Sequence, residues 1–149
     1  MKTIAVDLMG GDNAPESIAN GVIEAVNEYD DIKILADGLK GSFPHQHERV
    51  EFIEVSESIN SDDDPVKSVR RKKDSSLVRA AKAVKDKEAL AVLSAGNTGA
   101  LLTAGLFVVG RIKGIERPAI ASMIPTTGDK GLMLLDMGAN SENKPNHLL

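Results

Sequence analysis

Leu93-Ser94-Ala95-Gly96-Asn97-Thr98-Gly99-Ala100-Leu101-Leu102 is the stretch from which the fold is best read. The apolar run 89–93 leads into it and the apolar segment 100–109 leads out of it. This pattern predicts a buried strand, a tight loop and a buried helix. Gly96 and Gly99 let the backbone turn sharply and leave no side chains between it and a ligand.

The loop at residues 94–99 has two interpretations. Asn97 and Thr98 place short polar side chains beside the first free N–H groups of the helix. Those groups and the helix dipole form a natural seat for an anion such as phosphate. An ordinary strand-to-helix connection with an Asn or Thr N-cap explains the same residues. Taken alone, the loop favours the helix cap slightly, because caps are far more common than phosphate sites.

The composition is that of an ordinary globular protein and excludes several classes of function. The 149 residues are 42% hydrophobic and 27% charged, which predicts a single domain over residues 1–149. The net charge is -4 and there are only four aromatic residues (three Phe, one Tyr), so no nucleic-acid partner is expected. The absence of cysteine excludes disulfides and an acyl-cysteine intermediate within this chain. Neither a signal segment nor a membrane-length apolar run is visible, so the expected location is cytoplasmic.

The first 28 residues predict a strand, a glycine turn and an amphipathic helix. The strand is 3–7, and apolar residues then recur at helical spacing from Ile18 to Val26. Asn13 and Glu16 have the spacing of a capping box. The acids Asp7 and Asp12 flank the glycine pair 10–11, which favours a ligand-facing loop over a plain turn.

The rest of the chain continues as alternating elements. Strands are predicted at 31–35, 50–55, 89–93, 118–124 and 132–135, with a turn at 36–38 after the first of them. Helices are predicted at 65–73, 75–86 and 100–109, and the last two strands are expected to pair as a hairpin. His45 and His47 are interpreted as solvated loop residues, because no further ligand completes a metal set.

A basic run, Arg70-Arg71-Lys72-Lys73, ends the helix that Asp64 and Pro65 open. Most such runs are solvated faces. In an acidic chain this one has two further interpretations, namely contact with phosphate or docking of an acidic protein partner.

Strands that alternate with helices predict a three-layer α/β sandwich with a mostly parallel sheet. Three polar loops follow strands: 9–13, 94–99 and 136–140. In open α/β sheets ligands bind beyond the carboxyl ends of the strands, so the three loops are expected to form one anion-binding crevice. Neither a P-loop nor a dinucleotide fingerprint is present.

The sequence also resembles a known family, the bacterial phosphate acyltransferases (the PlsX family). The motifs that carry the resemblance are Ile4-Ala5-Val6-Asp7, Met9 to Pro15, Asp64-Pro65-Val66, Val69 to Lys73, Ser94 to Ala100, Gly105-Leu106-Phe107, Gly110 to Ile115, Arg117-Pro118 and Leu135-Asp136 with Gly138-Ala139-Asn140. They run almost end to end in the family's order. Family members continue well beyond residue 149, so the chain resembles their N-terminal part.

The resemblance implies a fold similar to phosphotransacetylases and isocitrate dehydrogenases, and a homodimeric enzyme without cofactor or metal. It implies transfer of a fatty acyl group from acyl carrier protein to inorganic phosphate, which makes acyl phosphate for phospholipid synthesis. A membrane-bound glycerol-3-phosphate acyltransferase would consume the product. The family acts peripherally at the membrane, through an element expected in the missing C-terminal part.

These expectations assign roles to particular residues. Asn97 and Thr98 are the predicted catalytic residues. The predicted phosphate- or substrate-binding residues are Gly10, Gly11, Asp12, Asn13, Gly96, Gly99, Asp136 and Asn140, and the predicted contacts with phosphate or carrier protein are Arg70, Arg71, Lys72 and Lys73. Two alternatives stay open: a non-catalytic anion-binding α/β domain, and a dehydrogenase-like relative.

Overall fold

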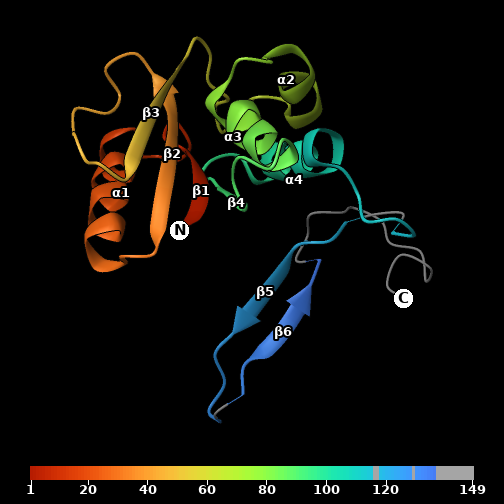
Figure 1. Cartoon of the computed structure of the whole chain (residues 1–149). Coiled ribbons are helices and arrows are strands. Elements are labelled where there is room, and N and C mark those ends of the chain that lie inside the picture. Colours follow the sequence, from red (N-terminus) through yellow and green to blue (C-terminus); the bar gives the residue numbers. More distant parts are fainter. Residues whose placement is uncertain (116–117, 129, 137–149) are drawn as a thin grey trace. The chain divides into compact units, whose positions relative to one another are not determined.

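A computed structural model describes residues 1–115, 118–128 and 130–136 of the chain (Figure 1). Contacts divide the chain into two units, Met1–Gly110 and Arg111–Leu149. The first unit contains the sheet and helices discussed below, and the second contains a hairpin.

A four-stranded parallel sheet organises the first unit. Its strands are β1 (Lys2–Asp7), β2 (Ile32–Leu39), β3 (Val50–Val55) and β4 (Ala91–Leu93), in the spatial order β3-β2-β1-β4. Each neighbouring pair is parallel. The prediction of an α/β sandwich with a parallel sheet is therefore confirmed.

Helices cover both faces of the sheet (Figure 1). The helical segments are α1 (Glu16–Glu28), α2 (Pro65–Arg71), α3 (Ser76–Lys85), α4 (Thr98–Ala104) and the π-helical turn η1 (Gly105–Val109). Val6 packs with Val22 and Val26 of α1, whereas its neighbour Ala5 packs with Ala80 of α3. Because both faces of β1 are covered, its middle residues 4–6 are all apolar and do not alternate with polar ones.

Several boundaries differ from the sequence-based expectation. The predicted turn at 36–38 is part of β2, because all three residues pair with β3 and the first two also pair with β1. The capping box at Asn13 is wrong: Pro15 occupies the N-cap of α1, and no side chain caps it. Asn13 instead accepts a hydrogen bond from the Ser17 N–H through its carbonyl, at 3.1 Å.

The helical stretch after the central loop is less buried than expected. It begins at Thr98, and only Ala100, Thr103 and Ala104 of α4 are buried. The side chain of Phe107 in η1 is 55% exposed. Apolar sequence alone therefore overstated the burial of this segment.

The second unit holds an antiparallel hairpin of β5 (Ala121–Ile124) and β6 (Leu132–Leu135), as the short connection predicted. The sequence also predicts the opening of a further helix at 144–147, which lies outside the described residues, as does most of the loop 136–140. In the described parts of both units, no helix is long and apolar enough to cross a membrane.

Candidate functional site: the crevice between β1 and β4

The chain changes direction across the sheet at β1. It moves outward from β1 to β2 and β3, and then returns to add β4 on the other side of β1. The segments that follow β1 and β4 therefore diverge from neighbouring carboxyl ends. Ligands of open α/β sheets bind at such a switch point. We call the segments 9–13 and 94–99 the crevice loops.

The two crevice loops touch through glycine. A Cβ built on Gly10 would lie 2.7 Å from a carboxylate oxygen of Asp7 and 2.8 Å from the Gly96 nitrogen. A Cβ on Gly96 would lie 2.9 Å from the Gly10 Cα. Real Cβ atoms essentially never approach other atoms this closely, so both positions require glycine. The structure thus brings together the predicted site residues Gly10 and Gly96.

A hydrogen-bonded chain that the sequence analysis missed joins the strands beneath these glycines. The Ser94 hydroxyl donates to Oδ2 of Asp7 at 2.7 Å and accepts from the Gly96 N–H at 3.2 Å. Oδ1 of Asp7 accepts from the Met9 N–H at 3.1 Å. In the sequence, Asp7 is only an acid near a glycine turn and Ser94 only a small loop residue, so neither is predicted as a site residue. Their positions at the ends of two strands were the available signal.

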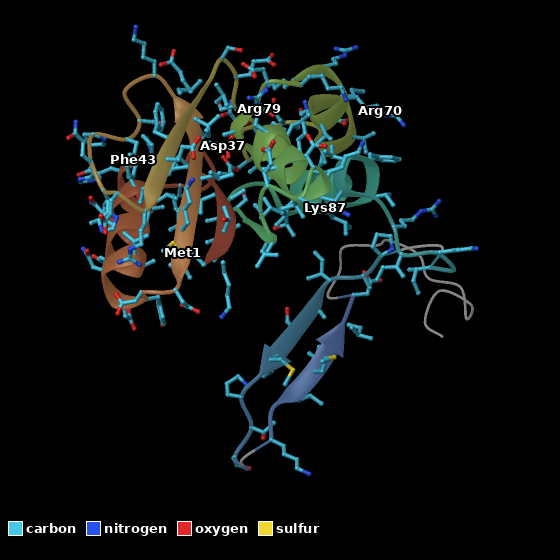
Figure 2. All side chains as sticks on the ribbon, in the orientation of Figure 1. Met1, Asp37, Phe43, Arg70, Arg79 and Lys87 are labelled. Carbon is cyan, nitrogen blue, oxygen red and sulfur yellow. The ribbon has the colours of Figure 1, made fainter. Side chains whose placement is uncertain are left out.

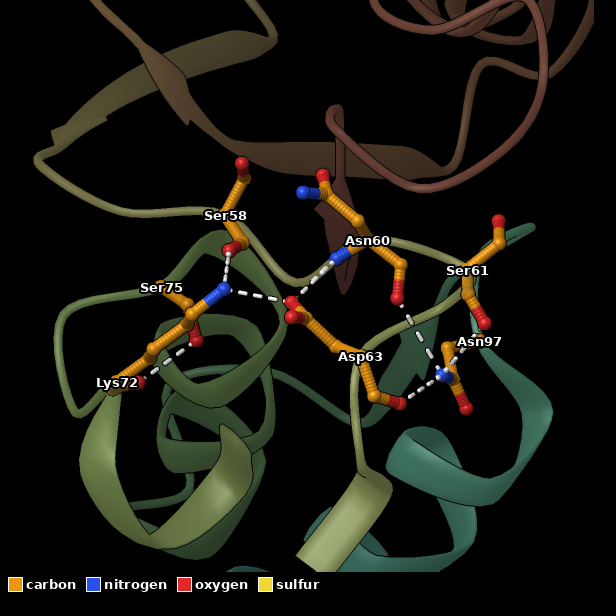
Figure 3. A network of polar contacts seen from close by, with 7 residues as sticks. All are labelled: Ser58, Asn60, Ser61, Asp63, Lys72, Ser75 and Asn97. Atoms are coloured by element: carbon orange, nitrogen blue, oxygen red, sulfur yellow. Dashed lines mark hydrogen bonds and ion pairs between the residues drawn. The ribbon is translucent and has the colours of Figure 1, made fainter. Parts of the chain in front are cut away.

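Asn97 is fully engaged by the protein (Figure 3). Its Oδ1 accepts from the Ala100 N–H at 3.0 Å, so it is the N-cap of α4. Its side-chain amide donates to the carbonyls of Asn60, Ser61 and Asp63, at 3.3, 3.2 and 3.1 Å. Asn97 therefore ties α4 to the segment before α2, and its predicted catalytic role stays a prediction.

Donors at the start of α4 remain for a ligand. Within the described part of the chain, the backbone N–H groups of Thr98 and Gly99 have no acceptor. Thr98 is exposed. Gly99 lies against Pro65, where a Cβ would come within 2.8 Å of the proline ring. The first turn of α4 is thus held by α2 and directs free donors outward.

The remaining predicted binding residues fall into two groups. Gly11, with φ of 120°, lies beside Ala95 of the other crevice loop, and Asp12 and Asn13 are exposed next to it. Asp136 belongs to the second unit, where its N–H donates to the Ile120 carbonyl at 2.7 Å. Asn140 lies outside the described residues. The convergence of the third loop with the other two stays a prediction.

The four basic residues at the end of α2 and directly after it do not act alike. Nζ of Lys72 bonds the Asp63 carboxylate at 2.6 Å and the Ser58 carbonyl at 2.9 Å (Figure 3). The hydrogen bond from Lys72 lowers the pKa of Asp63, as does the Asn60 N–H. Arg70 lies 5.5 Å over the Phe107 ring, and Arg71 and Lys73 are exposed. We call Arg70, Arg71 and Lys73 the basic surface.

Two further features adjoin the crevice. An apolar hollow of about 120 Å³ is lined by Val6, Ile18, Leu93 and Ala95, together with Asp7 and Ser94. On β2, Asp37 is buried beneath α3 near Arg79 (Figure 2). Burial raises the pKa of the Asp37 carboxyl to about 7; the positive charge of Arg79 opposes this shift, and the negative charges of Asp7 and Glu88 add to it.

These features define a class: a parallel α/β protein with glycine backbone at its switch point and, in the described part of the chain, unpaired N–H groups at the start of the adjoining helix. The family model described as "Fatty acid synthesis protein" matches residues 2–149. The chain belongs to that family, which confirms the resemblance seen in the sequence.

Curated relatives agree along the whole chain. The phosphate acyltransferase of Streptococcus uberis is 56% identical over 99% of this chain. The phosphate acyltransferases of Staphylococcus haemolyticus and Staphylococcus aureus are 52% and 50% identical over all of it. In each case the chain spans 45% of the relative's length.

Proposed function

We propose that this chain is part of an enzyme that transfers a fatty acyl group from acyl carrier protein to inorganic phosphate. The observation that carries the proposal is the crevice itself. Its glycines, Ser94 and the Asn97 cap form an anion seat in a chain at least half identical to phosphate acyltransferases. The product, an acyl phosphate, would serve phospholipid synthesis.

In the reaction, a phosphate oxygen attacks the thioester carbonyl carbon, the carbon–sulfur bond breaks and the carrier's thiolate leaves, taking up a proton. Phosphate is itself the nucleophile, so no acyl-enzyme is required. The protein's tasks are to hold phosphate against the thioester and to stabilise the developing oxyanion.

The crevice residues divide these tasks. The free N–H groups of Thr98 and Gly99 hold phosphate oxygens, and the Thr98 hydroxyl donates to the oxyanion. Asn97 orients this turn of helix through its cap bond. Gly10, Gly11 and Gly96 let the ligand approach the backbone, and the substrate-facing rim is formed by Asp12 and Asn13.

The acyl chain and its carrier need further surfaces. The apolar hollow beside Ser94 would take the first carbons of the acyl chain. Arg70, Arg71 and Lys73 supply positive charge for an acidic carrier protein, whereas Lys72 is already paired with Asp63. The proposal has three further parts. The enzyme is a homodimer, it is cytoplasmic and meets the membrane peripherally, and a membrane glycerol-3-phosphate acyltransferase acts on its product.

The test is phosphate-dependent release of free thiol from acyl carrier protein that carries a long acyl chain. It is run on this chain and on a chimera in which the remaining part of the Streptococcus uberis relative follows residue 149. We expect release by the chimera.

A substitution in the apolar hollow tests the acyl site separately. Ile18→Trp fills this hollow and should impair acyl transfer without changing phosphate affinity. Folded proteins that bind phosphate without releasing thiol would indicate a binding module, and folded proteins that do neither would overturn the anion seat as well.

A further inference from the structure

Three polar side chains form a row across neighbouring strands under the crevice loops. β1 pairs with β2 so that Asp7 lies opposite Asp37. β1 pairs with β4 so that Val6 lies opposite Leu93, and the next position brings Asp7 beside Ser94. Asp7 is 4% exposed and Asp37 3% exposed. Buried carboxyls are rare unless they are paired, so the row demands an explanation.

We propose that Asp7 and Ser94 are positioning residues for the anion seat, and that Asp37, by holding a proton beside Asp7, sets the pH range in which they act. The proposal rests on the proposed function, because the anion it concerns is the phosphate substrate.

The Asp7–Ser94 bond fixes the shape of one crevice loop. The Ser94 hydroxyl donates a hydrogen bond to Asp7 and so turns a lone pair toward the Gly96 N–H. Gly96 is thereby held against Gly10, and the loop enters α4 with the Thr98 and Gly99 N–H groups free. Without the Ser94–Asp7 hydrogen bond, the Gly96 N–H competes with the N–H groups of Thr98 and Gly99 for the anion. The loop also loses its anchor to β1.

Asp7 can perform this task only as a carboxylate. It accepts one hydrogen bond on each oxygen, from the Met9 N–H and from the Ser94 hydroxyl. An asparagine has one oxygen, so it satisfies one donor and sets its own N–H₂ against the other. Asp7→Asn therefore preserves size and burial but breaks half of the arrangement.

Asp37 is the second carboxyl in the row and lacks Asp7's partners. Its Oδ2 is buried without a hydrogen-bond partner in the described chain. Two adjacent buried carboxyls resist ionising together, so one of them keeps its proton. Because Asp7 accepts two hydrogen bonds and Asp37 Oδ2 accepts none, the proton belongs on Asp37. The pKa of Asp37, raised to about 7 chiefly by burial, agrees with this assignment.

The charges that face Asp37 come from every element around it. Arg79, Lys82 and Asp86 lie on or just after α3, and Glu88 follows them. These four residues line a hollow together with Asp37, which we call the Asp37 hollow. Lys33 of β2 and Glu51 of β3 line the Asp37 hollow as well and are paired with each other at 2.8 Å. The exposed charges are screened by solvent, so ionisation of buried Asp37 above pH 7 is felt most by Asp7. A second negative charge there disfavours both the Asp7 carboxylate and a bound anion.

The test measures anion affinity against pH on the folded chain, with sulfate as the probe because it keeps its charge from pH 5.5 to 8.5. We expect the sulfate Kd of the unsubstituted chain to rise at least about threefold between pH 6 and pH 8. Asp37→Asn should flatten this dependence of the sulfate Kd on pH. Asp86→Asn, which removes an exposed acid that lines the Asp37 hollow, should leave the dependence unchanged. Asp7→Asn and Ser94→Ala should weaken binding at least about tenfold at every pH and shift the Gly96 amide resonance.

Two readouts keep the outcomes distinct. Carbon-13 NMR of labelled aspartates follows the Asp37 titration without any ligand, and Asp7→Asn should lower its midpoint. If sulfate and phosphate bind but affinity is insensitive to all three substitutions, the positioning proposal is overturned and the proposed function survives. If the unsubstituted chain binds neither anion, the proposed function falls and this proposal falls with it. Thermal unfolding of each variant identifies any that fail to fold, and Ser94→Ala then replaces Asp7→Asn.

Discussion

The crevice loops and the basic surface are built by opposite means. In the crevice, Gly10 and Gly96 lie so close that one extra carbon would collide with backbone, and Ser94 and Asp7 are hydrogen-bonded across two strands. On the basic surface, Arg71 and Lys73 are exposed, and within the described residues Nζ of Lys73 donates only to the Val69 carbonyl of α2, at 3.3 Å. The crevice therefore depends on shape, whereas the basic surface depends on charge.

This difference has consequences for how each region tolerates change. Close packing transmits a change of one methyl group, because the surrounding atoms have nowhere to move. Exposed charges act over a distance of about 10 Å and are screened by salt. The exact position of one exposed charge therefore matters little, and a neighbouring charge of the same sign can take its place. Substitutions at the two regions should differ in kind as well as in size.

The largest effect is expected for Gly10→Ala. The new methyl group would meet Asp7, Ser94 and Gly96 within 2.8 Å, so the two crevice loops must separate. We expect a loss of about 1–3 kcal/mol in the free energy of unfolding, together with loss of phosphate binding. The matched control is Gly105→Ala, whose added Cβ meets nothing within 4 Å and which should stabilise the helix by up to about 1 kcal/mol. Equal stability of the two variants would contradict the close approach.

A smaller effect on stability is expected at Asn97, where the cap of α4 and the hydrogen bonds to the carbonyls of residues 60–63 can be removed separately. Asn97→Asp keeps the oxygen that caps α4 but removes the amide that donates to three carbonyls of residues 60–63. Asn97→Ala removes both, and loss of the cap alone costs about 1 kcal/mol. In Asn97→Asp the second carboxylate oxygen faces the three carbonyls without a proton to share, so denaturant unfolding should show both variants to be less stable than the unsubstituted chain. Turnover in the acyl-transfer chimera that falls much more than stability in Asn97→Asp would assign the amide a direct catalytic role.

The third prediction divides the basic run. Lys72→Met retains the apolar stem but removes the bonds to Asp63 and the Ser58 carbonyl, of which the latter is worth about 1 kcal/mol. Arg71→Met should change stability by less than about 0.5 kcal/mol. Thermal unfolding of both variants is the measurement, and identical melting temperatures would show that Lys72 is as solvated as its neighbour.

The smallest change in stability is expected from charge reversal on the basic surface. Arg71→Glu with Lys73→Glu should leave unfolding unchanged, raise the apparent KM for acyl carrier protein in the chimera and weaken its salt dependence. The KM for phosphate should stay constant. If the carrier's KM and its salt dependence do not change, these residues are a solvated face.

Much of the fold was predictable because it depends on local pattern. The apolar period of α1, the Asp64-Pro65 helix start and the short connection of the β5–β6 hairpin all appear in the printed sequence and in the structure. The turn expected at 36–38 failed for a non-local reason. Ala36, Asp37 and Gly38 have a turn-like composition, but pairing with β3 along all three residues, and with β1 along the first two, keeps them extended.

The site was only half predictable. The sequence by itself determined that Gly10, Gly96, Asn97 and Thr98 lie in loops after strands, because glycine and small polar residues interrupt apolar runs there. Only the tertiary structure decided which groups meet: Ser94 with Asp7, Asn97 with the carbonyls before α2, and Lys72 with Asp63. Each of these contacts joins residues brought together by strand order or helix packing. A sequence states which groups a chain carries, but hydrogen bonds over 2.6–3.3 Å form only where the packed backbone places donor and acceptor together.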